Sequence, residues 1–100
     1  MDPDLPEFMI ADVVSPTAGR EAGKLYYVVG LDGDYILLAN GKDRSLEQPK
    51  RKKRKHADKV LRSETRVAVK LRNGDKVLDS ELRRDLAYLG REMQSKAIGG

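Results

Sequence analysis

The chain has 100 residues, of which 39% are hydrophobic and 36% charged, enough for one small domain with a modest core. It has no cysteine, which excludes disulfides, thiolate metal sites and cysteine nucleophiles. Its longest apolar runs, such as residues 35–39, are too short to span a bilayer, and the acidic start MDPDLPE does not resemble a signal peptide. We therefore expect a cytoplasmic protein.

Positive charge is concentrated in the centre of the chain, although the net charge is only +4. Residues 1–40 carry two basic and seven acidic side chains, residues 41–62 carry ten and three, and residues 63–100 carry eight and six. One strongly basic segment is typical of a surface that binds a polyanion. Because no amphipathic helix accompanies it, nucleic acid is favoured over a membrane as the partner.

Five short strands joined by small connections are predicted in the first two thirds of the chain. The Asp32-Gly33 pair predicts a tight hairpin turn, and Asn40-Gly41 predicts a second one that leads into a polar edge strand. Five short strands with a mixed apolar face favour a small closed barrel, because closure removes exposed strand edges. The expected strands cover residues 8–14, 25–31, 35–39, 42–48 and around 56–61.

A helical tail is predicted for residues 63–96. Ser63 is the expected N-cap of a short first helix, and the Asn73-Gly74 pair is its expected stop. The apolar residues at 67, 69 and 71 also alternate, so a hairpin remains the alternative for this segment.

A second helix is predicted with Asp79 or Ser80 as its cap. Its apolar residues form one stripe, which consists of Leu82, Leu86, Leu89 and Met93. At the two ends of the chain we expect a disordered acidic lead-in over residues 1–7 and a frayed end over residues 97–100. Residues 8–62 make up the expected barrel.

Six consecutive Lys and Arg residues occupy positions 50–55. Such a run also resembles a nuclear localisation signal, or it is simply solvated charge. The run lies between two predicted strands, however, so we expect a loop or strand extension that is anchored at both ends. A nuclear signal needs a flexible segment, and the position of the run therefore favours a phosphate-binding surface.

The segment between the first two predicted strands, SPTAGREAGK, has two glycines four residues apart and ends with a lysine. Gly19 and Gly23 allow a sharply folded loop, from which Arg20 and Lys24 project as positioned cations. The longer segment DVVSPTAGREAGKLYYVVGL resembles a KOW motif, in which a strand, a Gly-x-x-x-Gly-Lys loop and a second strand belong to a small SH3-like barrel.

The resemblance extends to the small standalone KOW proteins of Gram-positive bacteria, through the chain length, the KRKKRKH run and the LRNGDKVLDSELRRDL tail. Those proteins are relatives of the L-fourteen-e type of large-subunit ribosomal protein in archaea and eukaryotes. The resemblance implies an SH3-like KOW barrel over residues 8–62 and a ribosomal or ribosome-associated protein that binds structured ribosomal RNA in translation. Two positions depart from the pattern: Ala11 stands where many KOW motifs have glycine, and Leu78 stands where the last helix would be capped, which leaves Asp79 to take over.

The resemblance and the charge together imply one RNA-binding surface. The glycine loop, the Asn-Gly turn and the basic run are expected to line one face, because antiparallel strands bring alternate loops to the same end of a barrel. The expected RNA-binding residues are Thr17, Gly19, Arg20, Gly23, Lys24, Lys42, Arg44, Lys50, Arg51, Lys52, Lys53, Arg54, Lys55, His56 and Lys59. No metal or cofactor is expected, since the single histidine has no second His or Cys to complete a site.

Three tyrosines are candidates for stacking on nucleobases. Tyr26 and Tyr27 are adjacent in a predicted strand, so their side chains face opposite sides of the sheet. One of them is expected in the core, and at most one is free to stack. Tyr35 is the third candidate.

An enzyme is not expected. The sequence shows no nucleophile paired with a base, no carboxylate dyad and no phosphate-cradling loop before a helix, so no small-molecule substrate is expected either. The alternative function is a protein–protein adaptor, which would dock its acidic N-terminal half or its leucine stripe on a partner such as RNA polymerase or a ribosomal protein. Duplex DNA is disfavoured as a ligand, because no recognition helix stands out.

Overall fold

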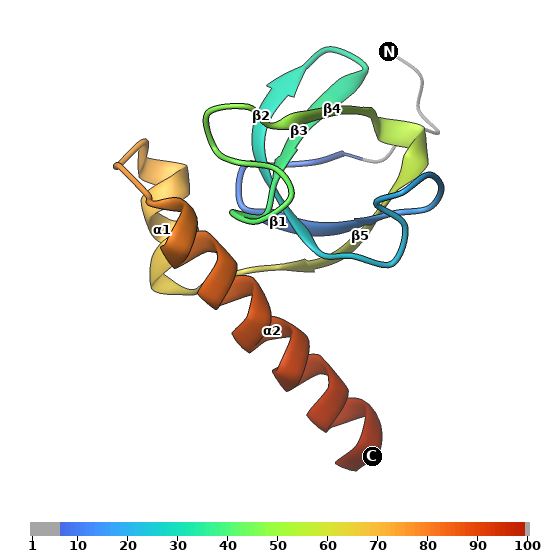
Figure 1. Ribbon diagram of the computed structural model, residues 1–100, viewed down its shortest axis with the longest axis vertical. Coiled ribbons are helices and arrows are strands. Elements are labelled where there is room, and N and C mark those ends of the chain that lie inside the picture. Colours follow the sequence, from blue (N-terminus) through green and yellow to red (C-terminus); the bar gives the residue numbers. More distant parts are fainter. Residues whose placement is uncertain (1–6, 100) are drawn as a thin grey trace.

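The computed structural model describes residues 7–99, so residues 1–6 of the expected acidic lead-in lie outside the described part of the chain. The described residues form one sheet followed by two helices, and the long C-terminal helix runs outward from the sheet (Figure 1). In chain order the elements are β1 (Asp12–Pro16), β2 (Tyr26–Asp32), β3 (Tyr35–Ala39), β4 (Lys50–Lys53), the 3₁₀ turn η1 (Arg54–His56), β5 (Ala57–Arg62), α1 (Arg66–Asn73) and α2 (Asp79–Gly99).

The five strands form one antiparallel sheet in the order β4-β3-β2-β1-β5. Register shifts between Val13 and Val14 and between Val28 and Gly30 mark β-bulges, which bend and twist a sheet, and the sheet curls visibly (Figure 1). In the described residues, β4 and β5 are edge strands that do not pair with each other. The closed barrel predicted from the five strands is therefore not formed by the strand pairing.

Four of the five strands lie close to their predicted positions, and β3 matches its prediction residue for residue. The first strand begins later than predicted, at Asp12 rather than residue 8. The reason lies in the preceding turn: Ala11 has a φ of 74°, and the backbone N–H of Asp12 donates to the carbonyl oxygen of Met9 at 3.1 Å. A residue in the left-handed region interrupts an extended strand, so β1 can begin only after this turn.

The predicted fourth strand at residues 42–48 is wrong. Asn40 Oδ1 accepts hydrogen bonds from the backbone N–H groups of Lys42 and Arg44, each at 3.0 Å, and the carbonyl oxygen of Arg44 accepts from the N–H of Gly41 at 3.0 Å. The asparagine side chain thus stabilises a loop in place of a two-residue hairpin turn. The strand that pairs with β3 is instead the basic run, which forms β4 and continues into η1.

The two faces of the sheet pack in two separate apolar clusters, because neighbouring strand residues point to opposite sides. The cluster inside the curl consists of Phe8, Val14, Tyr26, Val28, Ile36, Leu38 and Ala57. The cluster under the helices consists of Ala11, Val13, Tyr27, Ala39, Ala68, Leu82, Leu86 and Leu89. Tyr26 and Tyr27 are therefore both buried, one in each cluster, so that neither is free to stack, where at most one was expected to be.

The segment after β5 is a helix, α1, and the hairpin alternative is wrong. Its N-cap is Thr65 rather than the predicted Ser63, since Thr65 Oγ1 accepts a hydrogen bond from the backbone N–H of Ala68 at 3.2 Å. The helix ends as predicted at Gly74, whose φ of 76° is the left-handed cap conformation.

The second helix, α2, begins with Asp79 as its first helical residue and continues to Gly99, past the predicted end of the tail at residue 96. Three leucines of the predicted stripe, Leu82, Leu86 and Leu89, are buried against the sheet. The leucine stripe is therefore part of the core and is not available to dock on a partner.

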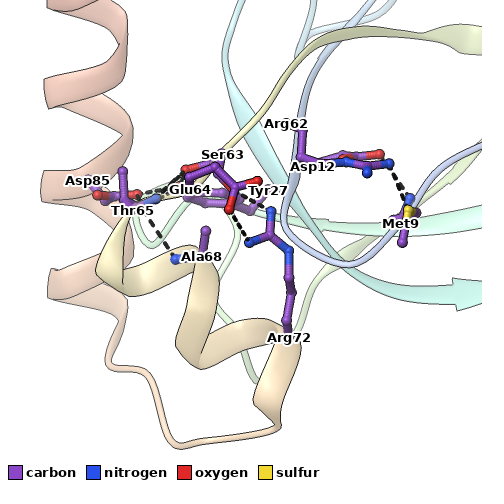
Figure 2. Close-up of polar contacts among 10 residues, drawn as sticks. All are labelled: Met9, Asp12, Tyr27, Arg62, Ser63, Glu64, Thr65, Ala68, Arg72 and Asp85. Carbon is purple, nitrogen blue, oxygen red and sulfur yellow. Dashed lines mark hydrogen bonds and ion pairs between the residues drawn. The ribbon is translucent and has the colours of Figure 1, made fainter.

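A buried polar network joins the sheet to both helices (Figure 2). The Tyr27 hydroxyl group donates a hydrogen bond to the Asp85 carboxylate of α2 and lies 2.8 Å from Ser63 Oγ. The N-cap residue Thr65 also donates to Asp85, at 2.8 Å. The network links the end of β5, the start of α1 and the first half of α2 through hydrogen bonds. It therefore sets the position of the helices on the sheet.

Candidate nucleic-acid interface

The loop between β1 and β2 folds into two successive turns. The backbone N–H of Ala22 donates to the carbonyl oxygen of Gly19 at 3.2 Å, and the backbone N–H of Lys24 donates to the carbonyl oxygen of Glu21 at 3.1 Å. Gly19 has a φ of 87°, a conformation that glycine adopts without strain. The loop is therefore sharply folded, as the spacing of its glycines predicted, and it leaves Arg20 exposed to solvent.

Glu21 connects this loop to two other segments. Its Oε1 lies 3.5 Å from Arg44 Nη2, and its Oε2 lies 3.7 Å from Lys52 Nζ. The hydrogen bond from its own backbone, together with the charges of Lys52 and Lys50, lowers the pKa of Glu21, although burial acts in the opposite direction. Glu21 was not among the residues predicted from the sequence, where its only signal was its position between the two glycines.

A second ion pair joins the same loop to the segment after β3. Lys24 Nζ donates to Asp43 Oδ2 at 2.9 Å, and Asn40 Nδ2 donates to the same oxygen at 3.4 Å. The hydrogen bond to Asp43 raises the pKa of Lys24, and the hydrogen bond from Lys24 lowers the pKa of Asp43. The loop residues at 17–25 and 40–45 thus come together, as predicted from the sequence.

The basic run does not line one face, contrary to the prediction. Lys50 and Lys52 pair with Leu38 and Ile36, so they share the side of the sheet on which the inner apolar cluster lies. Arg51 points to the opposite side, where its guanidinium carbon lies 3.8 Å from the centre of the Tyr35 ring. The run is split because it forms a strand, whose side chains alternate between the two faces.

The remaining predicted residues of the run follow β4 in the turn η1. The backbone N–H of Arg54 donates to the carbonyl oxygen of Asp34 at 2.9 Å, and the backbone N–H of Thr17 donates to the carbonyl oxygen of His56 at 3.0 Å. Lys55 and His56 are exposed. The turn is thus anchored to both neighbouring loops while the side chains of Lys55 and His56 face solvent and Arg54 is partly buried.

Lys59, the last predicted residue, lies near a buried carboxylate. Its Nζ is 3.4 Å from Asp12 Oδ2, and Arg62 Nε is 3.5 Å from the other oxygen of Asp12. Asp12 is fully buried, and its Oδ2 also accepts a hydrogen bond from the backbone N–H of Met9 at 2.9 Å. The two cations compensate a charge that would be costly to bury alone.

A groove of about 700 Å³ lies between the loop at 40–45 and α2. It is lined by Lys24, Leu25, Asn40, Lys42, Asp43, Arg83, Leu86 and Ala87. Arg83 was not among the predicted residues, because a residue 59 positions after the end of the glycine loop gives no local signal of this proximity. The groove adds the start of α2 to the predicted surface.

The surface as a whole is strongly cationic. Glu21 and Asp43 are surrounded by six basic side chains, which are Arg20, Lys24, Lys42, Arg44, Lys50 and Lys52.

Within residues 7–99, no helix is long and apolar enough to cross a membrane, and no three His, Cys, Asp or Glu side chains are grouped as metal ligands would be. No protein-family model and no curated protein matches the chain.

Proposed function

We propose that the protein binds RNA through this cationic surface and through the exposed lysines of the basic run, Lys53 and Lys55, with the fold and loop of a KOW domain in an SH3-like barrel. The observation that carries the proposal is the contact of Glu21 with Arg44 and Lys52, which gathers three basic segments that are distant in sequence. A cationic surface held in place by internal ion pairs loses less conformational entropy when it binds phosphates than flexible side chains would.

Structured ribosomal RNA is the ligand that we propose, so that the protein acts as a ribosomal or ribosome-associated protein. The major groove of A-form RNA is too narrow for side chains to reach the bases, and recognition of a helix then depends on phosphates and shape. Exposed cations such as Arg20, Lys53 and Lys55 suit phosphate contacts, and the burial of Tyr26 and Tyr27 argues against binding through stacked bases.

The proposal is tested by removing exposed charge from the basic run. In the double variant Lys53→Gln/Lys55→Gln we expect weaker binding to any structured RNA, because phosphate contacts do not depend on sequence. The slope of log K against log salt should decrease in magnitude by about 0.7–0.9 for each phosphate that the variant no longer neutralises. Fluorescence anisotropy with a labelled ribosomal RNA hairpin, measured over a range of salt concentrations, gives both quantities.

Lys76 supplies the matched control, since it is an exposed lysine in the connection between α1 and α2. Lys76→Gln should leave the affinity and the salt slope close to those of the unaltered protein. If the double variant of the run behaves like Lys76→Gln, the run does not contact phosphates and the proposal is wrong. Lys52 is unsuitable for this test, because its side chain is only 14% exposed and pairs with Glu21.

A protein–protein adaptor is the second candidate function, favoured by exposed apolar side chains near the helices. Val69 and Tyr88 are 44% and 48% exposed, and Tyr88 lines a groove of about 460 Å³ between α1 and α2. Nuclease treatment of a pull-down distinguishes the two functions. Partners held through RNA are lost after treatment, whereas partners held by the adaptor surface are retained.

A further inference from the structure

We propose that the groove between the loop at 40–45 and α2 holds an unpaired segment of the bound RNA, with Arg83 as a phosphate contact. This inference rests on the proposed function, because it assigns one part of the RNA to one part of the surface. It makes the C-terminal helix a direct part of the RNA-binding site.

The charges at the rim of the groove match the charge of an RNA strand. Lys24, Lys42 and Arg83 stand around it, against a single carboxylate, Asp43. Asp43 is already paired with Lys24 at 2.9 Å, whereas Lys42 and Arg83 form no ion pair with any residue of the described chain. Two cations are thus available to phosphates, which is the electrostatic arrangement that an RNA backbone requires.

The floor of the groove is apolar. Leu25, Leu86 and Ala87 form it, and this surface suits the ribose and base between two phosphates. The volume of about 700 Å³ falls within the range of ligand pockets, roughly 300–1,000 Å³, and suits a short stretch of single strand. An unpaired segment can lay its ribose and base on this apolar floor, whereas the bases of a double helix are paired and stacked inside it, and the groove therefore favours an unpaired segment.

The two walls of the groove are fastened to each other. The backbone N–H of Leu46 donates to Asp79 Oδ1 at 2.8 Å, which attaches the loop to the first residue of α2. A Cβ atom on Gly41 would lie 2.1 Å from the carbonyl oxygen of Asp79, so only glycine permits this close approach. Because the walls are already positioned, binding requires little ordering of the protein.

The test compares neutralisation of two neighbouring arginines. Arg83 lines this groove, whereas Arg84 lines the other groove, with Glu81 and Asp85. Arg83→Gln should weaken binding of a short fluorescein-labelled single-stranded RNA about ten-fold and reduce the magnitude of the salt slope by about 0.7. Arg84→Gln removes the same charge from the next helical position and should change the affinity less than about two-fold.

The duplex form of the same RNA identifies the ligand of the groove. Arg83→Gln should weaken binding of the duplex no more than Arg84→Gln does, because the duplex does not enter the groove. Equal effects of the two variants on the single strand, or an equal loss for single strand and duplex in Arg83→Gln, would overturn the inference.

Two further outcomes distinguish this inference from the proposed function. Failure of the unaltered protein to bind either RNA would overturn the proposed function, and this inference with it. An acidic peptide that displaces the single strand from the unaltered protein, and that also loses affinity in Arg83→Gln, would make the groove a protein-binding site and overturn the inference alone.

Discussion

At the scale of single residues, Ala11 and Glu21 show what the pattern of residue types does not reveal. Ala11 has a φ of 74°, a backbone conformation that glycine adopts without strain. An alanine there costs roughly 1–2 kcal/mol in backbone energy, while its methyl group is buried under the helices. Glu21 could not be given a role from the sequence, since the partners of a carboxylate become known only when the loops have folded together.

Tyr27 makes the stability of the protein decrease as the pH rises through the alkaline range. Burial, together with the hydrogen bond to Asp85, raises the pKa of Tyr27 from its ordinary value of 10.0 to about 12. The unfolded chain therefore ionises at this residue before the folded protein does. The stabilisation is fully present below pH 10 and is lost as the pH rises toward 12, by roughly 2–3 kcal/mol in total.

The measurement compares urea unfolding of the unaltered protein and of Tyr27→Phe between about pH 8 and pH 12. At pH 8 we expect the variant to be less stable by about 1–3 kcal/mol, because Ser63 and Asp85 lose a buried partner. This difference should shrink at higher pH, because ionisation of Tyr27 in the unfolded chain destabilises only the unaltered protein. A difference that stays constant over the whole range would show that the hydroxyl group does not titrate in this way.

At the scale of elements, the sequence pattern predicted those strands and helices whose residues have an intrinsic preference for the structure that they form. The segments that became β2, β3 and β5 are rich in apolar or β-branched residues, and α1 and α2 have helical spacing with caps or stops. β4 was missed because lysine and arginine are poor strand formers, and because the Asn40 side chain turned an expected hairpin into a longer loop. Pairing with β3 outweighs the propensity of the basic run.

The same pairing explains which parts of the site could be predicted. The glycine loop and the turn at 40–45 are local features, and both contribute to the surface. The division of the run between two faces required the register of β4, and the participation of Arg83 required the position of α2. Those two features depend on contacts between distant parts of the chain, about which a single sequence carries no direct signal.

The loop between β1 and β2 gives a prediction at this scale. In Gly19→Val the new Cβ atom would lie 3.3 Å from Glu21 Oε2 and 3.7 Å from Lys52 Nζ, in a backbone conformation with a φ of 87°. We expect the ion pair between these side chains to be displaced and the affinity for RNA to fall. The salt slope should change little, because no cation is removed.

Gly33→Val is the control for this loop variant. Gly33 also has a positive φ, of 59°, but nothing lies within 4 Å of a Cβ atom there, in the turn between β2 and β3. Both variants should lose roughly 1–3 kcal/mol of stability through backbone strain, and only Gly19→Val should lose affinity. The shape of the loop is unimportant for binding if the two variants, compared by thermal unfolding and anisotropy, keep the same affinity.

At the scale of the whole molecule, the acidic first part of the chain neutralises a portion of the basic centre. Three of its carboxylates, Asp12, Glu21 and Asp32, pair with cations from residues 41–62. The lysines that stay exposed on β4 and η1 carry the charge that a partner meets, and charge on an edge strand also opposes pairing with a second sheet. The net charge of +4 therefore understates the positive charge of one side of the molecule.

This distribution of charge predicts how the protein behaves in a cell lysate. We expect it to sediment with the large ribosomal subunit through sucrose at low salt and to remain at the top of the gradient at high salt. The reason is that its proposed contacts are made by exposed lysine and arginine side chains, which salt screens, while two of its three candidate stacking tyrosines are buried. Lys53→Gln/Lys55→Gln should leave the subunit at a lower salt concentration than the unaltered protein does, and Lys76→Gln should not. Comigration that persists at high salt would indicate an integral ribosomal component, held by contacts other than surface charge. A protein that stays at the top of both gradients would contradict the ribosomal proposal and make the adaptor function the better explanation of the exposed Val69 and Tyr88.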